Sequence, residues 1–171
     1  MISWLSDDIK EFSNKMLDAA KLNLVTNGYV APVMFLLMPN KQLVIIGLRF
    51  GNSEEKRAVY SAIERQIAEN KPEGVIMINE CWMKATNSDD LETVKRMEEH
   101  GVRAEADKSE AITMIVSPVS STDSFTIQRF HKDEGKIVFD GKPETSLTEF
   151  ENRLLPPQWK LRKTAREAVV N

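Results

Sequence analysis

The sequence predicts a single-domain α+β protein with a mixed or antiparallel sheet and helices packed mainly on one face. Three features support this prediction: an amphipathic helical repeat near the start, several β-rich runs separated by turn residues, and residues 74–84, which begin apolar and end polar. The expected order is α-β-β-α-β, then a loop or short helix, then β-β-β-α. The domain is expected to span residues 1–157, with a basic C-terminal tail over residues 158–171.

The composition is that of an ordinary folded domain. Of the 171 residues, 42% are hydrophobic and 29% are charged, and a chain of this length can bury a sizeable core. The single cysteine cannot form an internal disulfide, which favours a reducing compartment. The sequence shows neither a signal peptide nor an apolar run of about 20 residues, so we expect a cytoplasmic protein without a membrane partner.

The first predicted helix covers residues 6–26. Apolar residues recur along it at three- and four-residue steps and form one stripe among charged neighbours. Ser6 is the expected N-cap, and Gly28 supplies the left-handed stop. The stripe comprises Ile9, Phe12, Met16, Ala20 and Leu24.

A β-hairpin is predicted from residues 29–38 and 42–50, around a short turn at residues 39–41. Both runs are apolar at consecutive positions, which indicates strands covered on both faces, or lying beneath a helix layer, over part of their length. Pro32 has no backbone N–H to donate, so we expect the first strand to lie at a sheet edge there or to bulge.

A second helix is predicted over residues 54–70, with Ser53 as its N-cap. Residues 74–84 follow as the central strand of the sheet, shielded by the opening helix. The polar end of this strand, which contains Glu80 and Trp82, is expected to reach the rim of the sheet.

Residues 85–108 are predicted to be a long connection with little helix. Residues 89–100 fit a short helix that ends at Gly101. The eight acidic and four basic residues between Asp89 and Glu110 also suit a solvated excursion. We therefore expect one or two helical turns here.

The last part of the sheet is predicted from residues 109–118, a strand, and from residues 124–132 and 136–140, a second hairpin. Thr145 or Ser146 is the expected cap of a short helix that follows. The apolar positions of this helix are Leu147, Phe150 and Leu154.

Charge is distributed unevenly along the chain. The formal net charge is −3, and residues 158–171 carry +3, which leaves −6 on the rest. A negative balance disfavours a general nucleic-acid binder, because phosphate contacts need clustered cations. The simpler prediction for the basic segment is a solvated final helix, and the alternative is a segment that docks on the acidic body or on a partner. Its basic residues are Lys160, Arg162, Lys163 and Arg166.

Candidate chemistry lies at the end of the central strand. Strand alternation puts Glu80 and Trp82 on one face and Asn79 and Cys81 on the other. A carboxyl group in a pocket walled by an indole acquires a raised pKa and can then act as a general acid or base. The alternative is a structural ion pair between Glu80 and Arg49, which lies near the end of a neighbouring predicted strand.

An enzyme needs a group that assists Glu80, and Arg49 and His131 are the candidates. Cys81 is predicted to be a buried, inert thiol, because neither His100 nor His131 has the sequence context of a Cys–His dyad. Metal-ligand spacings such as H-x-H, H-E-x-x-H or C-x-x-C do not occur, and neither do dinucleotide-binding, phosphate-binding or nucleophile-elbow motifs. No metal and no cofactor are therefore predicted.

Two short motifs resemble a known group of proteins. Glu80-Cys81-Trp82 closes an apolar strand, and Glu110-Ala111 opens a later strand after a charged excursion. This arrangement is similar to a loose group of microbial and phage proteins of unknown function, in which one strand ends in Glu-Ala-Trp and a later one opens with a Glu-Ala step. Cys81 departs from that alanine. The resemblance covers about the middle half of the chain and implies a fold without an assigned activity.

These observations favour a non-enzymatic binding or accessory protein that acts through protein–protein contacts. Trp82 and Asn79 are its candidate binding residues on the central strand. The expected partner is another protein, or a second copy of the chain joined through a sheet edge or the tail. The alternative is a small hydrolase or other acid/base enzyme that uses Glu80. The second alternative is a nucleic-acid accessory protein that uses the basic tail.

Overall fold

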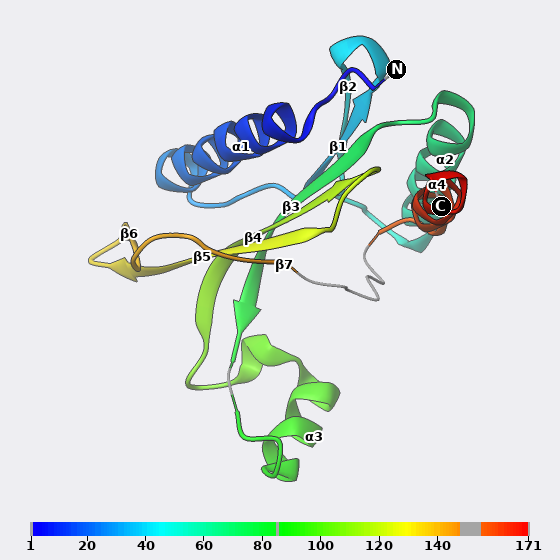
Figure 1. The fold of residues 1–171 in the computed structure, drawn as a ribbon. Helices are drawn as coiled ribbons and strands as arrows, with labels where there is room; N and C mark the ends of the chain where they lie inside the picture. Colours follow the sequence, from blue (N-terminus) through cyan, green and yellow to red (C-terminus); the bar gives the residue numbers. More distant parts are fainter. Residues whose placement is uncertain (1, 85, 148–154, 171) are drawn as a thin grey trace.

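The computed structural model describes residues 2–84, 86–147 and 155–170, with the backbone alone for residues 166–170. These residues confirm the α+β class, because four helices accompany a curled antiparallel sheet of seven strands (Figure 1). The strand order is β2-β1-β3-β4-β5-β6, and β7 also pairs with β5. The elements are α1 (Ser6–Asn27), β1 (Val33–Met38), β2 (Gln42–Gly47), α2 (Ser53–Asn70), β3 (Gly74–Met83), α3 (Leu91–His100), β4 (Ser109–Pro118), β5 (Ser124–Asp133), β6 (Lys136–Phe139), β7 (Glu144–Leu147) and α4 (Pro157–Val170).

The first helix begins and ends close to the predicted positions. Gly28, at φ 81°, ends α1 as predicted. The predicted Ser6 cap is wrong, because Leu5 is the N-cap residue and Ser6 lies in the first turn. The carboxylate of Asp8, in the first turn, accepts the N–H of the N-cap residue Leu5 at 2.9 Å, which is the reciprocal bond of a capping box. The buried residues of α1 are Ile9, Ser13, Leu17, Ala20 and Leu24.

The first hairpin, β1–β2, is confirmed with shorter strands than predicted. The expectation that Pro32 marks an edge or a bulge is wrong, because β1 begins only at Val33 and lies between β2 and β3. Pro32 precedes the strand, where its missing N–H breaks no ladder, and its carbonyl accepts the Leu48 N–H at 2.9 Å.

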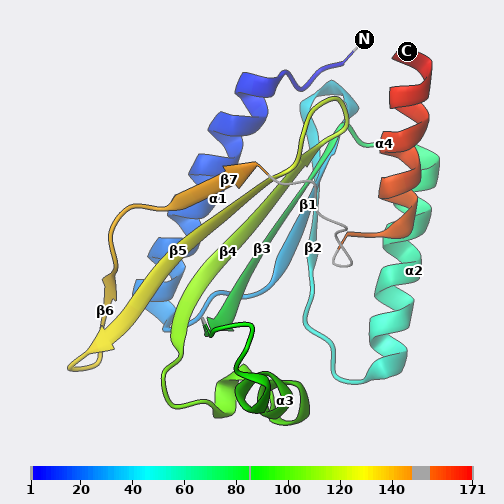
Figure 2. The ribbon, with the colours of Figure 1, turned by 60° about the horizontal axis from the view of Figure 1, so that its bottom comes forward.

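The sequence predicted helices mainly on one face of the sheet, whereas the structure has helices on both faces (Figure 2). Helix α1 covers one face, which we call the α1 face; α2 and α4 pack side by side on the opposite face, which we call the α2/α4 face. Strand residues alternate between two buried clusters, for example Phe35 and Ile76 on the α1 face and Met34 and Met77 on the α2/α4 face. This burial on both sides explains the continuous apolar runs.

Helix α2 is confirmed, although its predicted cap is displaced by one residue. Asn52, and not Ser53, is the N-cap, and its side-chain oxygen accepts the Glu55 N–H at 2.9 Å. Strand β3 then follows and lies in the interior of the sheet between β1 and β4, as predicted for the central strand.

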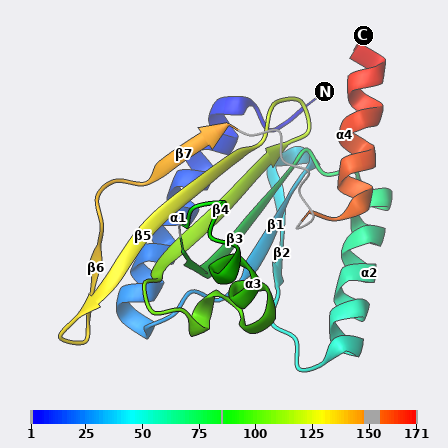
Figure 3. The same cartoon turned by 90° about the horizontal axis from the view of Figure 1, so that it is seen from below.

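Helix α3 is longer than the one or two turns expected for this connection. Asp90 caps the ten-residue helix by accepting the Thr93 N–H at 3.2 Å, and Gly101 ends it as predicted. The helix lies between the end of β3 and the start of β4, apart from the other helices (Figure 1), and it stands in front of the strands when the molecule is seen from below (Figure 3). Glu105 pairs with Arg96 of this helix and with Lys84 at the end of β3. A local sequence pattern does not show such pairs, so it predicted a helix that is too short.

The end of the chain differs most from the prediction. The late hairpin β5–β6 is confirmed. Thr145 and Ser146 do not cap a helix, because they lie in β7, where the Thr145 and Thr126 hydroxyls are 2.9 Å apart. Phe150 and Leu154 lie outside the described residues. The segment predicted as a basic tail forms α4 from Pro157 onward.

Candidate functional site

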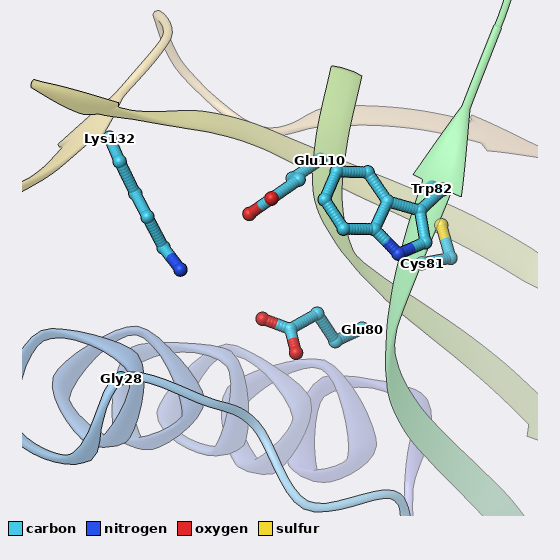
Figure 4. Close-up of a pocket in the computed structure, with 6 residues that line it drawn as sticks. All are labelled: Gly28, Glu80, Cys81, Trp82, Glu110 and Lys132. Atoms are coloured by element: carbon cyan, nitrogen blue, oxygen red, sulfur yellow. The ribbon is translucent and has the colours of Figure 1, made fainter. Parts of the chain in front are cut away.

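Glu80 lines an open pocket of about 140 Å³ at the C-terminal end of α1 (Figure 4). The carboxyl groups of Glu80 and Glu110 and the ammonium group of Lys132 point into this space from β3, β4 and β5. The pairing of the strands brings them together, because Trp82 lies opposite Glu110 and Glu110 lies opposite Phe130, two residues before Lys132. The residues that line this space, which we call the Glu80 pocket, are Gly28, Glu80, Cys81, Trp82, Glu110 and Lys132.

The pKa of Glu80 is raised. Partial burial of the carboxyl group is the largest cause, and the negative charge of Glu110 adds to it. A hydrogen bond from the Val30 backbone N–H and the positive charge of Lys132 oppose the shift. Glu80 thus combines a raised pKa with access to solvent, which are the properties of a proton donor or acceptor.

Trp82 forms one wall of the Glu80 pocket, as the sequence predicted. Its side chain is 36% exposed, and the ammonium group of Lys108 lies 5.0 Å from the centre of its ring. An indole in this position offers an apolar surface to a ligand or to a partner chain, while Lys108 already occupies one of its faces.

The two groups expected to assist Glu80 lie elsewhere. The guanidinium group of Arg49 stacks 4.7 Å from the Tyr29 ring, and neither Arg49 nor His131 lines the pocket. His131 Nδ1 lies 2.6 Å from Asp140 Oδ1. Alternation along β5 explains this placement, because the residue that faces the pocket is the neighbouring Lys132. The expected Glu80–Arg49 ion pair is absent from the ion pairs of the described residues.

Asn79 and Cys81 follow the alternation of β3 and point to the face opposite Glu80, although Cys81 also borders the Glu80 pocket. Burial raises the pKa of the Cys81 thiol, and the negative charge of Glu80 adds to the shift, while a hydrogen bond with the Thr113 side chain opposes it. A thiol with a raised pKa stays protonated, so it lacks the thiolate that a nucleophile needs.

Two basic residues of α4, Arg162 and Lys163, bond to the body of the protein. Arg162 Nε donates to the Pro72 carbonyl at 2.6 Å, and Lys163 Nζ lies 2.5 Å from Asp123 Oδ1. Lys160 is exposed, and the side chain of Arg166 lies outside the described part. Two of the four cations thus hold α4 in place, so they do not form an open surface for phosphate groups.

A feature that the sequence analysis did not resolve is the free edge of β2. The Leu48 N–H donates to the Pro32 carbonyl in continuation of the β1–β2 register, so the backbone groups of the even-numbered residues point toward β1. The N–H and C=O groups of Leu43, Ile45 and Gly47 therefore point outward, and no described residue pairs with them. We call these three residues the β2 edge.

Apolar side chains flank these free backbone groups. Ile45 is 63% exposed and Leu43 is 37% exposed, both on the α1 face, which α1 itself does not cover at β2. Gly47 is exposed as well, and because it has no side chain, this exposure belongs to the backbone. The local signal was the uncharged, proline-free run from Gln42 to Gly47, but only the strand order shows that this run lies at an edge.

The described residues contain no group of three or more His, Cys, Asp or Glu side chains placed to hold a metal ion. None of the helices in the same part of the chain combines the length and the apolar character that crossing a membrane requires.

The comparisons with known proteins identify one family. A family model described as bacteriophage lambda protein ea47 matches residues 1–159, and this description names no activity. No curated protein and no solved structure matches the chain. The matched range includes the Glu80 pocket, the β2 edge and the start of α4. Because the match covers most of the sequence, the chain belongs to the bacteriophage lambda protein ea47 family.

Proposed function

We propose that this protein is a non-enzymatic binding domain that adds an extended segment of another polypeptide to the β2 edge. The observation that carries this proposal is the row of unpaired backbone groups at Leu43, Ile45 and Gly47, flanked by exposed apolar side chains. An extended segment that pairs with such an edge gains main-chain hydrogen bonds and also buries apolar side chains.

The opposite margin of the sheet supports the same conclusion by contrast. Proteins protect free edges with short strands, interruptions, prolines and charges, because an open edge recruits other chains. On that margin β5 pairs with two four-residue strands, β6 and β7, separated by a segment that contains Gly141 and Pro143. Strand β2 is uninterrupted and carries no charge from Gln42 to Gly47. Only the β2 side therefore offers a continuous template.

The test replaces the central residue of the edge. Ile45→Pro removes an outward-pointing N–H and leaves the β1–β2 hydrogen bonds intact, whereas Ile45→Thr keeps the N–H. Peptides selected from a random display library on the full chain should bind the parent and, more weakly, the threonine variant. They should not bind the proline variant. On the parent chain, bound peptide should slow amide hydrogen exchange at Leu43, Ile45 and Gly47.

Two results would count against strand addition. One is a folded proline variant that binds the selected peptides as well as the parent does. The other is exchange protection that appears away from β2 on the parent chain, a measurement that does not depend on how well any variant folds.

A second candidate function is acid/base catalysis at Glu80. It is supported by the open pocket in which Glu80, with its raised pKa, faces Glu110 and Lys132. Hydrolysis of ester and phosphoester model substrates by the parent chain, lost in Glu80→Gln, would support it. Equal rates for the two proteins would remove this candidate. Nucleic-acid binding through α4 has less support, because Arg162 and Lys163 already bond within the protein.

A further inference from the structure

The geometry points to one class of partner for the β2 edge: an extended segment, antiparallel to β2, with apolar residues at alternate positions and an acidic residue opposite Arg49. This inference rests on the proposed strand addition and specifies what is added. Three properties of the edge support it: the poor fit of β2 to a second copy of itself, the open space beside Gly47, and the charges at the two ends of the strand.

A second copy of the chain fits the edge poorly. All three outward-facing residues can pair with a second β2 only when Ile45 lies opposite Ile45, which places Leu43 opposite Gly47. The same register brings Arg49 of each copy toward the Lys41–Asp8 pair of the other, so neither copy offers Arg49 an unpaired carboxylate. The two-fold symmetry repeats this mismatch at both ends of the strand pair. A different polypeptide is free of this constraint.

The side chains of the edge define the apolar positions of the partner. Residues opposite Ile45 and Leu43 meet exposed aliphatic side chains on the α1 face. Gly47 leaves more room, because a Cβ atom built on it meets no other atom within 4 Å. A large side chain opposite Gly47, such as an aromatic ring, fits this open space and covers the exposed glycine.

The charges at the two ends of β2 differ in how far they are compensated. Lys41 Nζ lies 2.7 Å from Asp8 Oδ2, so that end already carries a carboxylate. Arg49 is exposed and stacks 4.7 Å from the Tyr29 ring, and the ion pairs among the described residues do not include it. An acidic residue of the partner therefore complements the Arg49 end, and in an antiparallel segment it lies at the N-terminal side.

The experiment uses synthetic peptides as probes of the full chain. The peptide Glu-Thr-Phe-Thr-Val-Thr-Val places glutamate opposite Arg49, phenylalanine opposite Gly47 and valine opposite Ile45. Its control replaces the glutamate by lysine and changes nothing else. Fluorescence anisotropy measures affinity at low and high salt, with Arg49→Gln as the matched protein variant. Light scattering of the parent and of Ile45→Pro, without peptide, reports self-association.

We expect the glutamate peptide to bind roughly fivefold more tightly than the lysine peptide at low salt, which corresponds to one exposed charge contact. This preference should shrink in high salt and disappear in Arg49→Gln. Equal binding of both peptides, with amide protection at Leu43, Ile45 and Gly47, would overturn the acidic specificity and leave strand addition standing. Self-association of the parent that Ile45→Pro abolishes would identify a second copy as the occupant and overturn the inference. Failure of both peptides to bind a chain that stays monomeric would overturn the inference, and the proposed function would fall with it only if library-selected peptides also leave Leu43, Ile45 and Gly47 unprotected.

Discussion

At the scale of single residues, Glu80 differs from an ordinary surface glutamate because of the strands beside it. Alternation along one strand was enough to predict that Glu80 lies beside Trp82 and faces away from Asn79. Glu110 and Lys132 could not be predicted in the same way, because their approach depends on the registers of β3–β4 and β4–β5. A local pattern specifies the faces of a strand, but it does not specify which residue of the next strand lies opposite.

The raised pKa of Glu80 predicts a stability that depends on pH. The folded state holds the Glu80 proton more tightly than the unfolded state does, so this stabilisation is complete below the ordinary value of 4.5. It is lost as the pH rises through the folded-state pKa. Glu80→Gln cannot ionise, so we expect its free energy of unfolding, relative to that of the parent, to increase as the pH rises from about 4 to about 8. Urea unfolding at a series of pH values measures this difference.

Replacing the neighbours of Glu80 separates the causes of this shift. Glu110→Gln removes a like charge and should lower the pKa of Glu80, whereas Lys132→Met removes an opposite charge and should raise it further. Carbon-13 NMR titration of the side-chain carboxyl group follows both changes directly. A Glu80 pKa that is the same in the parent and in both variants would show that the three groups do not share a pocket.

At the scale of elements, α3 is held to the sheet by one carboxylate. The Glu105 side chain is 4% exposed and accepts hydrogen bonds from Arg96 at 2.8 Å and from Lys84 at 3.1 Å. The Arg96 hydrogen bond is the largest cause that lowers the pKa of Glu105 to about 2. The many charged residues of this segment predicted a solvated connection. The ion pair could not be predicted, because Lys84 and Glu105 lie 21 residues apart and a local pattern does not pair such residues. A segment rich in charged residues therefore forms a helix that is bonded to the end of β3.

Glu105→Gln should loosen α3 and leave the sheet intact. The variant loses both charge-assisted bonds, so we expect faster amide hydrogen exchange across residues 91–100 and unchanged exchange in β3 and β4. In the parent chain, the depressed pKa stabilises α3 above the ordinary glutamate value of 4.5, and this contribution is lost as the pH falls toward about 2. Exchange measured by mass spectrometry tests the variant at neutral pH.

The matched control is Glu98→Gln, which changes an exposed carboxylate of the same helix. It should leave exchange in α3 close to that of the parent. Similar acceleration in both variants would assign the effect to the charge of the helix instead of to the Glu105 contacts. Acceleration throughout the sheet in Glu105→Gln would mean that α3 and the sheet unfold as one unit.

At the scale of the whole molecule, helices cover both faces of the sheet, and β2 lies at one of its margins. The continuous apolar runs left open a sheet covered on both faces or one beneath a single helix layer, and we predicted helices mainly on one face. The structure shows cover on both faces, because the side chains of β1 and of Val75 to Ile78 in β3 belong to one or the other of two cores. The order of the strands decides which strand lies at a free edge of the sheet, and the sequence of β2 alone does not reveal this order. The same limit applies to β7, whose pairing with β5 overrides a helix-cap signal at Thr145 and Ser146.

Helix α4 completes the core of the α2/α4 face, and its removal should therefore affect the whole molecule. Trp159 is fully buried, and its Nε1 donates to Ser117 Oγ at 2.7 Å. We expect Trp159→Ala to lower the free energy of unfolding by about 3–5 kcal/mol, because it leaves a large cavity in the core and removes the hydrogen bond to Ser117 Oγ. Leu161→Ala, in the same helix but 61% exposed, should change it by less than about 0.5 kcal/mol. Urea unfolding followed by circular dichroism compares the two. Equal, small effects would make residues 158–171 an appended tail, and the cover of the α2/α4 face would then belong to α2 alone.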